Sequence, residues 1–354
     1  MDILRTITEL SHAFGTSEYV QAGGGNTSCK TEDTLWIKPS GTTLAALTME
    51  SFVAMDRKAL SRLYEAETPK EPAAREELVK EMMAAAVRPE TPGRASVEAP
   101  LHDSLSARFV VHTHPASVNG LTCALGGKAA AARLFPDALW VPYTDPGYTL
   151  CMAVRQAIQN HKQEKGCEPR LLLLENHGVF VCGDTDAEVR STYARLMDAL
   201  ARSYAELNVA AKVPMGEAPL EAHVAKWRAI LTEALGVDAS SVIAAGRFCT
   251  ASGPVSPDHI VYAKSYEFEG VLTVENLRAF KAVRGYAPRV VVLDNAVLGV
   301  GTGEKAARLA LTLALDGALV KRLARAFGGL QYLSDRAREF IENWEVESYR
   351  SKQS

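Results

Sequence analysis

The chain is organised around the stretch Val110-Val111-His112-Thr113-His114-Pro115-Ala116-Ser117-Val118. Its β-branched start predicts a strand, and the proline marks where that strand ends. Because alternate side chains of a strand share one face, His112 and His114 can present their imidazoles to a single point. Two imidazoles on one face suit a metal ion, so the stretch predicts a metal site at a strand end.

The other ligands of this metal site are predicted from two separate segments. The apolar run 171–174 breaks at Glu175-Asn176-His177-Gly178, which places His177 at another strand end, beside a glycine that permits close approach. Glu98 precedes the histidine pair and could be either a fourth ligand or the acid/base group beside the metal. A single metal site is therefore expected, in the first half of the chain only.

Two turns near the N-terminus are rich in hydrogen-bond donors. The first is Gly23-Gly24-Gly25-Asn26-Thr27-Ser28, in which glycines let backbone N–H groups turn toward an anion. The predicted strand 34–38 then leads through Lys38 to Pro39-Ser40-Gly41-Thr42-Thr43. A triple glycine alone is a weak signal, but two such turns joined by one strand could face a single phosphate group.

Composition and charge exclude several classes of function. The chain has 354 residues, 47% of them hydrophobic, which predicts one large or two modest domains. A formal net charge of -3, without a block of like charge, argues against nucleic acid as a partner. Neither a signal peptide nor an uncharged segment of bilayer length is visible, so we expect a cytoplasmic protein that does not enter membranes.

The cysteines and the remaining histidines are interpreted as structural. The six cysteines form no Cys-x-x-Cys pair, which predicts reduced, individually buried thiols. His102, one helical turn after Glu98, is expected to be a structural histidine or a support for the site. His259 is interpreted as a residue at the start of a strand.

Hydrophobic periodicity predicts alternating strands and helices with a boundary inside the segment 211–219, which holds two prolines and a glycine. The predicted domains are 1–212, which carries the metal site, and 220–354, a smaller α/β domain. The segment 48–88 is predicted to be mostly helical. The second domain is predicted to have strands at 241–245, 259–263, 290–293 and 297–300, and helices at 274–283 and 305–327.

An internal similarity links the two halves. Residues 172–179 read Leu-Leu-Leu-Glu-Asn-His-Gly-Val, and residues 291–298 read Val-Val-Leu-Asp-Asn-Ala-Val-Leu. The position of His177 is taken by Ala296 in the second segment. Either the second domain is a degenerate duplicate without the metal ligand, or two ordinary strand-loop-helix units coincide.

Six motifs, in this order, resemble those of the class II aldolase/adducin family. This family includes fuculose-phosphate and rhamnulose-phosphate aldolases, ribulose-phosphate 4-epimerase and methylthioribulose-phosphate dehydratase. The resemblance covers about residues 1–210. The motifs are Gly25-Asn26-Thr27-Ser28, Lys38-Pro39-Ser40-Gly41, Glu98 with Leu101-His102, His112-Thr113-His114-Pro115, Val141-Pro142-Tyr143 with Pro146-Gly147, and Asn176-His177-Gly178.

The second half resembles the end of the aldolase part of bifunctional rhamnulose-phosphate aldolase/lactaldehyde dehydrogenases. No Gly-x-Gly-x-x-Gly loop occurs within the 354 residues, so hydride transfer is not expected from them. The residues that carry this similarity are Ser256-Pro257-Asp258-His259-Ile260, Pro288-Arg289-Val290-Val291, Gly328-Gly329-Leu330 and Glu342-Asn343-Trp344.

The resemblance implies a three-layer α/β/α fold with a mostly antiparallel central sheet. It implies Zn²⁺, or another divalent metal, held by His112, His114 and His177, with Glu98 as both ligand and acid/base. It also implies a phosphate site with Lys38 nearby. The residues it would place around the phosphate are Gly25, Asn26, Ser40, Gly41 and Ser96.

Two further positions bear on this implied site. The paired serine of the family reads Ser96-Val97 here, and Lys30 or Lys38 could supply the missing contact or bind a carboxylate instead. The family's catalytic tyrosine has no clear counterpart, and Tyr143 and Tyr148 are only nearby candidates.

The expected function is zinc-dependent retro-aldol cleavage of a phosphorylated ketose or related sugar derivative, through a metal-stabilised enediolate. An epimerase or a dehydratase acting on a sugar phosphate at the same metal site is an alternative. A non-catalytic, adducin-like interaction module is another. The resemblance also implies a homo-oligomer, usually a tetramer.

Overall fold

A computed structural model describes residues 2–89, 91 and 93–344 of the chain. Met1 and residues 345–354, which the predicted domains include, lie outside the described residues. The chain divides into two compact units. Unit 1 comprises Met1–Val118 and Lys128–Ala201, and unit 2 comprises Asn119–Gly127 and Arg202–Ser354. Unit 2 thus includes a short segment from the first half, which the predicted boundary at 211–219 does not anticipate.

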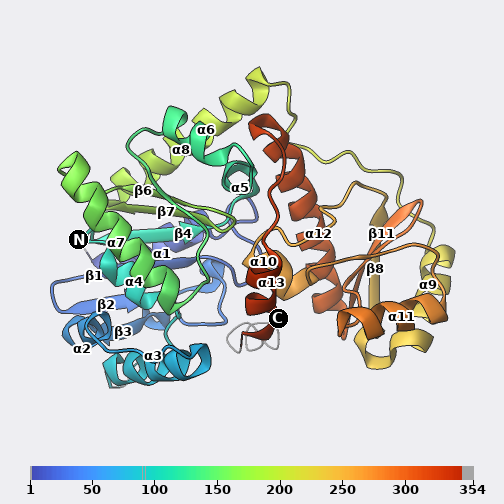
Figure 1. The fold of residues 1–354 in the computed structure, drawn as a ribbon, viewed down its shortest axis with the longest axis horizontal. Coiled ribbons are helices and arrows are strands. Elements are labelled where there is room, and N and C mark those ends of the chain that lie inside the picture. The colour runs from blue at the N-terminus through green and yellow to red at the C-terminus, as the bar shows by residue number, and fades with distance from the viewer. Residues whose placement is uncertain (1, 90, 92, 345–354) are drawn as a thin grey trace. The chain divides into compact units, whose positions relative to one another are not determined.

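Unit 1 is built on a seven-stranded sheet with the order β3-β2-β1-β4-β7-β6-β5 (Figure 1). Every neighbouring pair is antiparallel except β5 and β6, which confirms the prediction of a mostly antiparallel sheet. Strand β4 lies at the centre and ends within the His-Thr-His stretch. The strands are β1 (Asn26–Lys30), β2 (Thr34–Ile37), β3 (Val53–Asp56), β4 (Phe109–Thr113), β5 (Leu139–Val141), β6 (Leu171–Leu174) and β7 (Gly178–Gly183).

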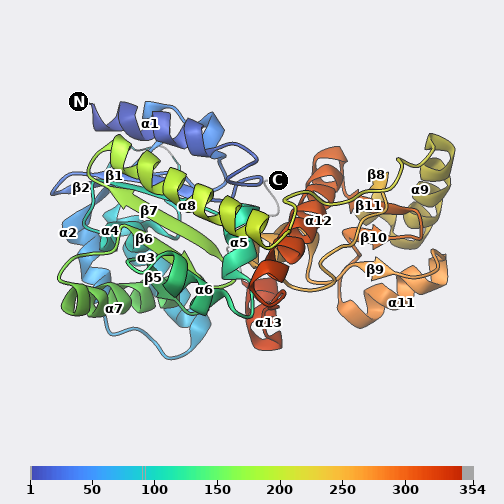
Figure 2. The same cartoon turned by 90° about the horizontal axis from the view of Figure 1, so that it is seen from above.

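Helices cover both faces of this sheet and complete the three layers (Figure 2). Helices α1 (Ile3–Phe14) and α8 (Asp186–Glu206) cover one face, whereas α4 (Ala99–Ser104) and α7 (Tyr148–Lys165) cover the other. The remaining helices that begin in this part of the chain are α2 (Arg57–Ser61), α3 (Pro72–Ala86), α5 (Ala116–Thr122), α6 (Gly127–Leu134), and the 3-10 turns η1 (Leu44–Ala46), η2 (Met49–Ser51) and η3 (Arg62–Tyr64).

Successive side chains of β4 point to opposite faces of the sheet, and each face is covered by a different helical layer. Val110 is fully buried in the core that includes Leu101 of α4 and Val154 of α7. Thr113 points the other way, and its hydroxyl is 2.8 Å from the hydroxyl of Tyr193 on α8. His112 shares the face of Val110 because it lies two residues further along the strand.

Unit 2 has a four-stranded sheet with the order β8-β11-β10-β9. Gly299 leaves room for α12, since a Cβ there would lie 2.1 Å from the carbonyl oxygen of Ala307. The opposite face packs Leu298 against Leu231 and Leu277. The elements are α9 (Glu221–Leu235), η4 (Gly236–Ala239), β8 (Ser241–Gly246), α10 (Pro257–Ala263), β9 (Phe268–Glu269), α11 (Val274–Arg284), β10 (Val290–Val292), β11 (Ala296–Gly301), α12 (Glu304–Ala324), η5 (Arg325–Phe327) and α13 (Asp335–Asn343).

One prediction of secondary structure is wrong, and another is incomplete. Residues 259–263 belong to helix α10 rather than to a strand, because Ser256 is at the N-cap and Pro257 opens the first turn, where its missing N–H costs nothing. The segment 48–88 is mostly helical, as predicted, but it also contains the four-residue strand β3, which pairs with β2. Pairing with a neighbouring strand decides the conformation of so short a segment, and local periodicity does not reveal it.

The internal similarity corresponds to two antiparallel strand pairs, β6–β7 and β10–β11, each followed by a helix of 21 residues. The pairing registers differ by one residue relative to the aligned sequences, since Leu174 pairs with Gly178 but Val292 with Val297. Ala296 is fully buried in the core of unit 2. That the second domain is a degenerate duplicate of the first therefore stays a prediction.

None of the six cysteines, which all lie within the described residues, forms a disulfide. Four are buried as predicted, but Cys167 and Cys249 are exposed. The described helices all lack the combination of length and hydrophobicity that a bilayer-spanning segment needs.

Lys30 connects the central sheet to helix α4. Its ammonium is buried and donates to the carbonyl oxygens of His102 and Leu105, the latter at 2.5 Å. These carbonyls lie at the C-terminal end of α4, where a positive charge is favourable. Lys30 is thus engaged with the backbone and is not arranged as a phosphate ligand. Burial lowers its pKa from 10.5 to about 8, against the opposing effect of Asp103.

This burial predicts a pH-dependent contribution to stability. Between pH 8 and 10.5 the unfolded chain retains the lysine proton and the folded chain does not, so the free energy of unfolding should rise with pH. The slope from this residue is at most about 1.4 kcal/mol per pH unit. Urea unfolding of the wild type and of Lys30→Met at pH 7, 8, 9 and 10 gives the free energy of unfolding of each protein, and the difference between the two at each pH is the contribution of Lys30. A pH-independent difference would contradict the prediction.

Candidate metal and substrate site

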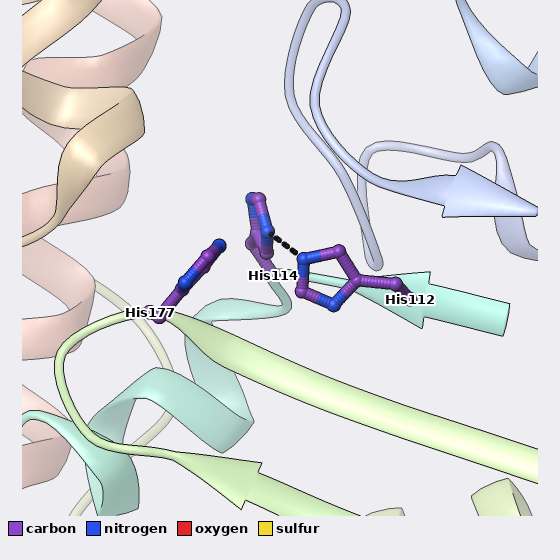
Figure 3. Close-up of side chains that lie close together, drawn as sticks. All are labelled: His112, His114 and His177. Atoms are coloured by element: carbon purple, nitrogen blue, oxygen red, sulfur yellow. Dashed lines mark hydrogen bonds between the residues drawn. The ribbon is translucent and has the colours of Figure 1, made fainter. Parts of the chain in front are cut away.

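Three imidazole rings converge at one end of the central sheet of unit 1 (Figure 3). One ring nitrogen from each of His112, His114 and His177 lies within 4.8 Å of the others. The two Nε2 atoms of His112 and His114 are 2.9 Å apart. His112 is the penultimate residue of strand β4, His114 directly follows that strand, and His177 belongs to the loop that joins β6 to β7.

The orientation of His112 is set by the two strands that flank β4. Asn26 of β1 and Phe180 of β7 are its direct neighbours across the sheet. The Phe180 ring stacks on the imidazole with centroids 3.9 Å apart and planes inclined by 11°. The Nδ1 atom is 2.9 Å from the Val179 carbonyl oxygen, which only accepts, so Nδ1 carries the proton and Nε2 presents a lone pair to the site.

Gly178 makes room for the ring of His114. A Cβ at this position would lie 2.5 Å from His114 Cδ2 and 2.5 Å from the Thr113 carbonyl oxygen. Gly25 plays a similar part at the other side of β4, because it has φ +73° and a Cβ there would lie 2.7 Å from the His112 carbonyl oxygen. Both glycines are therefore required by the packing around the histidines.

Glu98 completes the cluster from the start of helix α4. Its Oε1 is 3.3 Å from His112 Nε2 and 3.7 Å from His177 Nε2, while Oε2 accepts a hydrogen bond from Asn26. The backbone N–H of Glu98 donates to Ser96 Oγ at 3.3 Å. One oxygen of the carboxylate thus faces the imidazoles, and the other is held by an amide that anchors it to the sheet.

His102 lies behind Glu98 and is fully buried. Its Nδ1 is 2.8 Å from Ser28 Oγ. Burial lowers the pKa of His102 to about 3, although the nearby Glu98 charge raises it, so the ring is neutral at physiological pH. His102 thus contacts β1 beside Glu98, and which of its two predicted roles it has, structural histidine or support for the site, stays open.

The donor set suits a divalent metal ion. Two ligands at zinc distances of about 2.0–2.1 Å in tetrahedral geometry lie roughly 3.3 Å apart, and the observed separations of 2.9, 3.3 and 3.7 Å bracket that value. Three imidazoles and one carboxylate match the borderline character of zinc and similar ions. His112, His114 and His177 could hold a metal, with Glu98 as a fourth ligand or as its immediate neighbour.

The two donor-rich turns are joined by Lys38. Its buried ammonium donates to the Gly23 carbonyl at 3.3 Å and to the Thr42 carbonyl at 2.8 Å. Lys38 therefore ties the glycine loop to the turn that contains Ser40 and Gly41. The predicted phosphate site between the two turns stays a prediction.

The second turn is attached in the same way to the segment before Glu98. The Ser40 N–H donates to the Arg94 carbonyl at 2.8 Å, and Pro39 forms an isolated bridge with Ala95. Gly41 has φ +82°, which favours glycine. The structure thus brings both turns and Ser96 to the end of the sheet where Asn26 and the histidines lie.

The two candidate tyrosines differ in environment. Tyr148 is buried in a core cluster, and its hydroxyl donates to the Leu63 carbonyl at 3.5 Å, so its role is structural. Tyr143 is half-buried; its backbone N–H donates to Glu175 at 3.0 Å and its hydroxyl to Asp145 at 3.5 Å. Neither contact explains a catalytic role.

Sequence reasoning missed two supports of the site. Phe180, which stacks on His112, and Val179, whose carbonyl selects the tautomer, both lie in β7. The alternation within β7 predicts which face Phe180 takes, but only the register with β4 shows which residue it meets. The role of Asn26 as the partner of Glu98 was likewise hidden, because the two are 72 residues apart.

Comparison with known families bears on this site. Residues 5–204 match the family model described as "Class II Aldolase and Adducin N-terminal domain". The chain belongs to the class II aldolase and adducin family. The match includes all the predicted site residues and ends before most of unit 2, so the similarity predicted for the second half stays a prediction.

Individual relatives also match part of the chain. The uncharacterized oxidoreductase YuxG of Bacillus subtilis (strain 168) is 30% identical over 173 residues, which are 46% of this chain and 24% of that protein. The matched stretch is thus about a quarter of that relative's length.

Solved structures also resemble this aldolase family member. The N-terminal class II aldolase domain of a protein from Thermoplasma acidophilum is 25% identical, with a TM-score of 0.48 and coverage of 57% of this chain and 93% of that one. The L-fuculose-1-phosphate aldolase of Thermus thermophilus is 18% identical, with a TM-score of 0.36 and coverage of 56% and 92%. Because both TM-scores are below 0.5, membership of the family rests on the family model.

Replacing Gly178 tests the packing of His114. In Gly178→Ala the new methyl group meets the His114 ring and the Thr113 carbonyl, so we expect displacement of the imidazole and a loss of about 10- to 100-fold in divalent-metal affinity. Competition with a chromogenic chelator measures this affinity. Gly303→Ala is the control, since its Cβ would have no neighbour within 4 Å. Equal affinities in the two variants would contradict the assigned packing.

Proposed function

We propose that this chain is a metal-dependent aldehyde-lyase that cleaves a phosphorylated ketose, or a related sugar derivative, by a retro-aldol reaction. The metal we propose is Zn²⁺ or another divalent ion. The family itself includes enzymes with other outcomes, so the proposal rests on the arrangement of Glu98 among the three histidines.

The observation that best supports the proposal is that the two oxygens of the Glu98 carboxylate have different neighbours. Oε1 faces His112 and His177, whereas Oε2 is held by Asn26. A carboxylate anchored in this way can stay near a substrate carbon while it takes up or releases a proton. Three imidazoles without such a carboxylate would support metal binding alone.

A bound divalent ion would polarise the ketose carbonyl and offset negative charge that develops on its oxygen. The protein's own part is to position the sugar and move protons. We propose that the C4 hydroxyl gives up its proton and becomes the aldehyde carbonyl as the C3–C4 bond breaks, and that Glu98 takes up this proton and delivers it to C3. In the reverse direction Glu98 removes the proton from C3 and returns it to the aldehyde oxygen as the bond forms. Asn26 keeps the carboxylate oriented through its amide, and Phe180 keeps the His112 ring in place.

The phosphate group of the substrate is proposed to lie between the two donor-rich turns. Lys38 holds these turns together and adds a buried positive charge. The backbone at Gly25 and Gly41, the Ser40 and Ser96 hydroxyls, and the Asn26 amide would surround the phosphate. Binding energy from this group would fix the distance between Glu98 and the reacting carbon.

Glu98→Gln tests the proton transfer separately from the fold. The amide keeps the size of the side chain but cannot exchange a proton, so we expect a loss of about 100- to 10,000-fold in kcat with the fold retained. Coupled assays for dihydroxyacetone phosphate and lactaldehyde, run over a panel of ketose phosphates, measure cleavage. Glu164→Gln, an exposed glutamate on α7, is the matched control. Full activity in Glu98→Gln would refute the assigned role.

The same panel separates the proposed lyase from its alternatives. His114→Ala should lose both bound metal and activity, whereas His223→Ala, an exposed histidine on α9, should lose neither. If the products keep the carbon skeleton of the substrate, the protein is an epimerase or a dehydratase rather than a lyase. Metal-free wild type after reconstitution, together with no turnover of any substrate, would favour a non-catalytic interaction module.

A further inference from the structure

His114 directly follows β4, at the point where pairing with the neighbouring strands stops. The ladder between β1 and β4 ends at His112, opposite Asn26, and the ladder between β4 and β7 ends at Thr113, opposite Val179. The sheet therefore fixes the backbone of His112 directly, whereas the backbone of His114 depends on contacts outside these two ladders.

One such contact comes from the segment that follows α1. The backbone N–H of His114 donates to the Tyr19 carbonyl oxygen at 3.0 Å. The ring of Tyr19 in turn meets the ring of Phe14, the last residue of α1, edge to face, with centroids 5.0 Å apart. The residue that accepts the N–H of a predicted metal ligand is thus packed against α1.

A second contact holds Thr113, which lies between the two histidines. Its hydroxyl is 2.8 Å from the hydroxyl of Tyr193 on α8, which covers this face of the sheet together with α1 (Figure 2). The Tyr193 hydroxyl also donates to the Val111 carbonyl oxygen at 3.3 Å. Because a carbonyl oxygen only accepts, the tyrosine proton is directed to Val111, and the threonine hydroxyl is the donor in the shorter contact.

The ring of Tyr193 connects these two contacts. It is fully buried, and its centroid lies 4.2 Å from that of Phe14 and 5.7 Å from that of Tyr19, the latter pair at 88°. Aromatic rings packed in this way have few alternative orientations. Tyr193 thus holds Thr113 through its hydroxyl and supports Tyr19 through its ring. One of these two residues precedes His114 in the chain, and the other accepts its N–H.

Packing alone does not explain why this position is a tyrosine. A phenylalanine would make the same ring contacts without the cost of burying a polar group. Burial raises the pKa of Tyr193, so the hydroxyl stays protonated and able to donate. The hydroxyl is explained by its contacts with β4, the strand that leads into the histidines.

We propose that Tyr193 and Thr113 are positioning residues for the metal ligand His114, an inference that rests on the metal site of the proposed function. Both act through the backbone, because Thr113 points to the face opposite the imidazoles. A ligand that is already held in place loses little further freedom when an ion binds, which increases affinity. Without the hydroxyl pair, part of the binding free energy would be spent on ordering the end of β4.

Two variants that each remove one hydroxyl test this role. Tyr193→Phe keeps the ring, and Thr113→Val keeps the shape of the side chain. We expect each to weaken Zn²⁺ binding about 3- to 10-fold, the effect of one lost neutral hydrogen bond. Competition with a chromogenic chelator measures the affinity. Wild-type affinity in either variant overturns the proposal.

Tyr148→Phe is the matched control for Tyr193→Phe. It also removes a buried tyrosine hydroxyl, but from a core cluster of unit 1 in which that hydroxyl donates to the Leu63 carbonyl. We expect wild-type Zn²⁺ affinity in this variant. The visible absorption of Co²⁺ bound in place of Zn²⁺ reports the ligand geometry, and it should change in Tyr193→Phe but not in Tyr148→Phe. The same change in both variants contradicts a specific role for Tyr193.

The double variant Thr113→Val/Tyr193→Phe tests whether the two hydroxyls act as one contact. Since each single replacement already breaks the bond between them, the double variant should lose little more affinity than the weaker-binding single variant. Losses of binding free energy that add fully in the double variant would show that the hydroxyls act separately, and would contradict the assigned pair.

Thr113→Ser separates positioning from folding. Serine keeps the hydroxyl and removes only a methyl group, so we expect Zn²⁺ affinity close to that of the wild type. Urea unfolding of the metal-free variants measures stability independently of the ion. A Thr113→Ser variant that binds Zn²⁺ as weakly as Thr113→Val contradicts the role of the hydroxyl.

None of these measurements depends on turnover. A wild type that binds Zn²⁺ but cleaves no ketose phosphate would refute the proposed lyase, and the affinities of the variants would still decide the role of Tyr193. Unchanged Zn²⁺ affinity in Tyr193→Phe, combined with cleavage by the wild type, would refute the positioning role alone.

Discussion

The pairing of β4 with β1 and β7 is the constraint on which the candidate site depends. It places Asn26, His112 and Phe180 in one row across the sheet. From that row follow the stacking of the imidazole, its hydrogen bond to Val179 and the anchoring of Glu98 by Asn26. A slip of one residue in either pairing would turn His112 to the opposite face, toward the layer of α1 and α8.

The histidines and the alternation of strands and helices were predictable because their signals are local or periodic, whereas the three-layer fold with a mostly antiparallel sheet was predicted from the family resemblance. Alternation in 110–114 places two imidazoles on one face, and a glycine after His177 indicates close packing. The role of Asn26 was not predictable, because its contact with Glu98 depends on a strand pairing and a helix start far apart in sequence. For the same reason Lys30, a candidate for anion binding, proved to be a link between β1 and the end of α4.

Unit 2 shows where local sequence signals conflict with one another. The Ser-Pro-Asp start of α10 has the features of a helix N-terminus, yet the apolar residues that follow, 260–263, favour a strand. The helix ends at Lys264 in a strained conformation, and that strain cannot be read from a sequence without the backbone angles. Unit 1 thus has its buried polar cluster around Glu98, and unit 2 has a strained backbone conformation at Lys264.

The central claim is that His112, His114, His177 and Glu98 form one metal site. The most direct measurement is the metal content of the reconstituted protein, combined with X-ray absorption spectroscopy of the bound ion. The account predicts about one divalent ion per chain with imidazole ligands, and little metal in the double variant His112→Ala/His114→Ala. Equal metal content in the wild type and the double variant, or an ion without imidazole ligands, would contradict it.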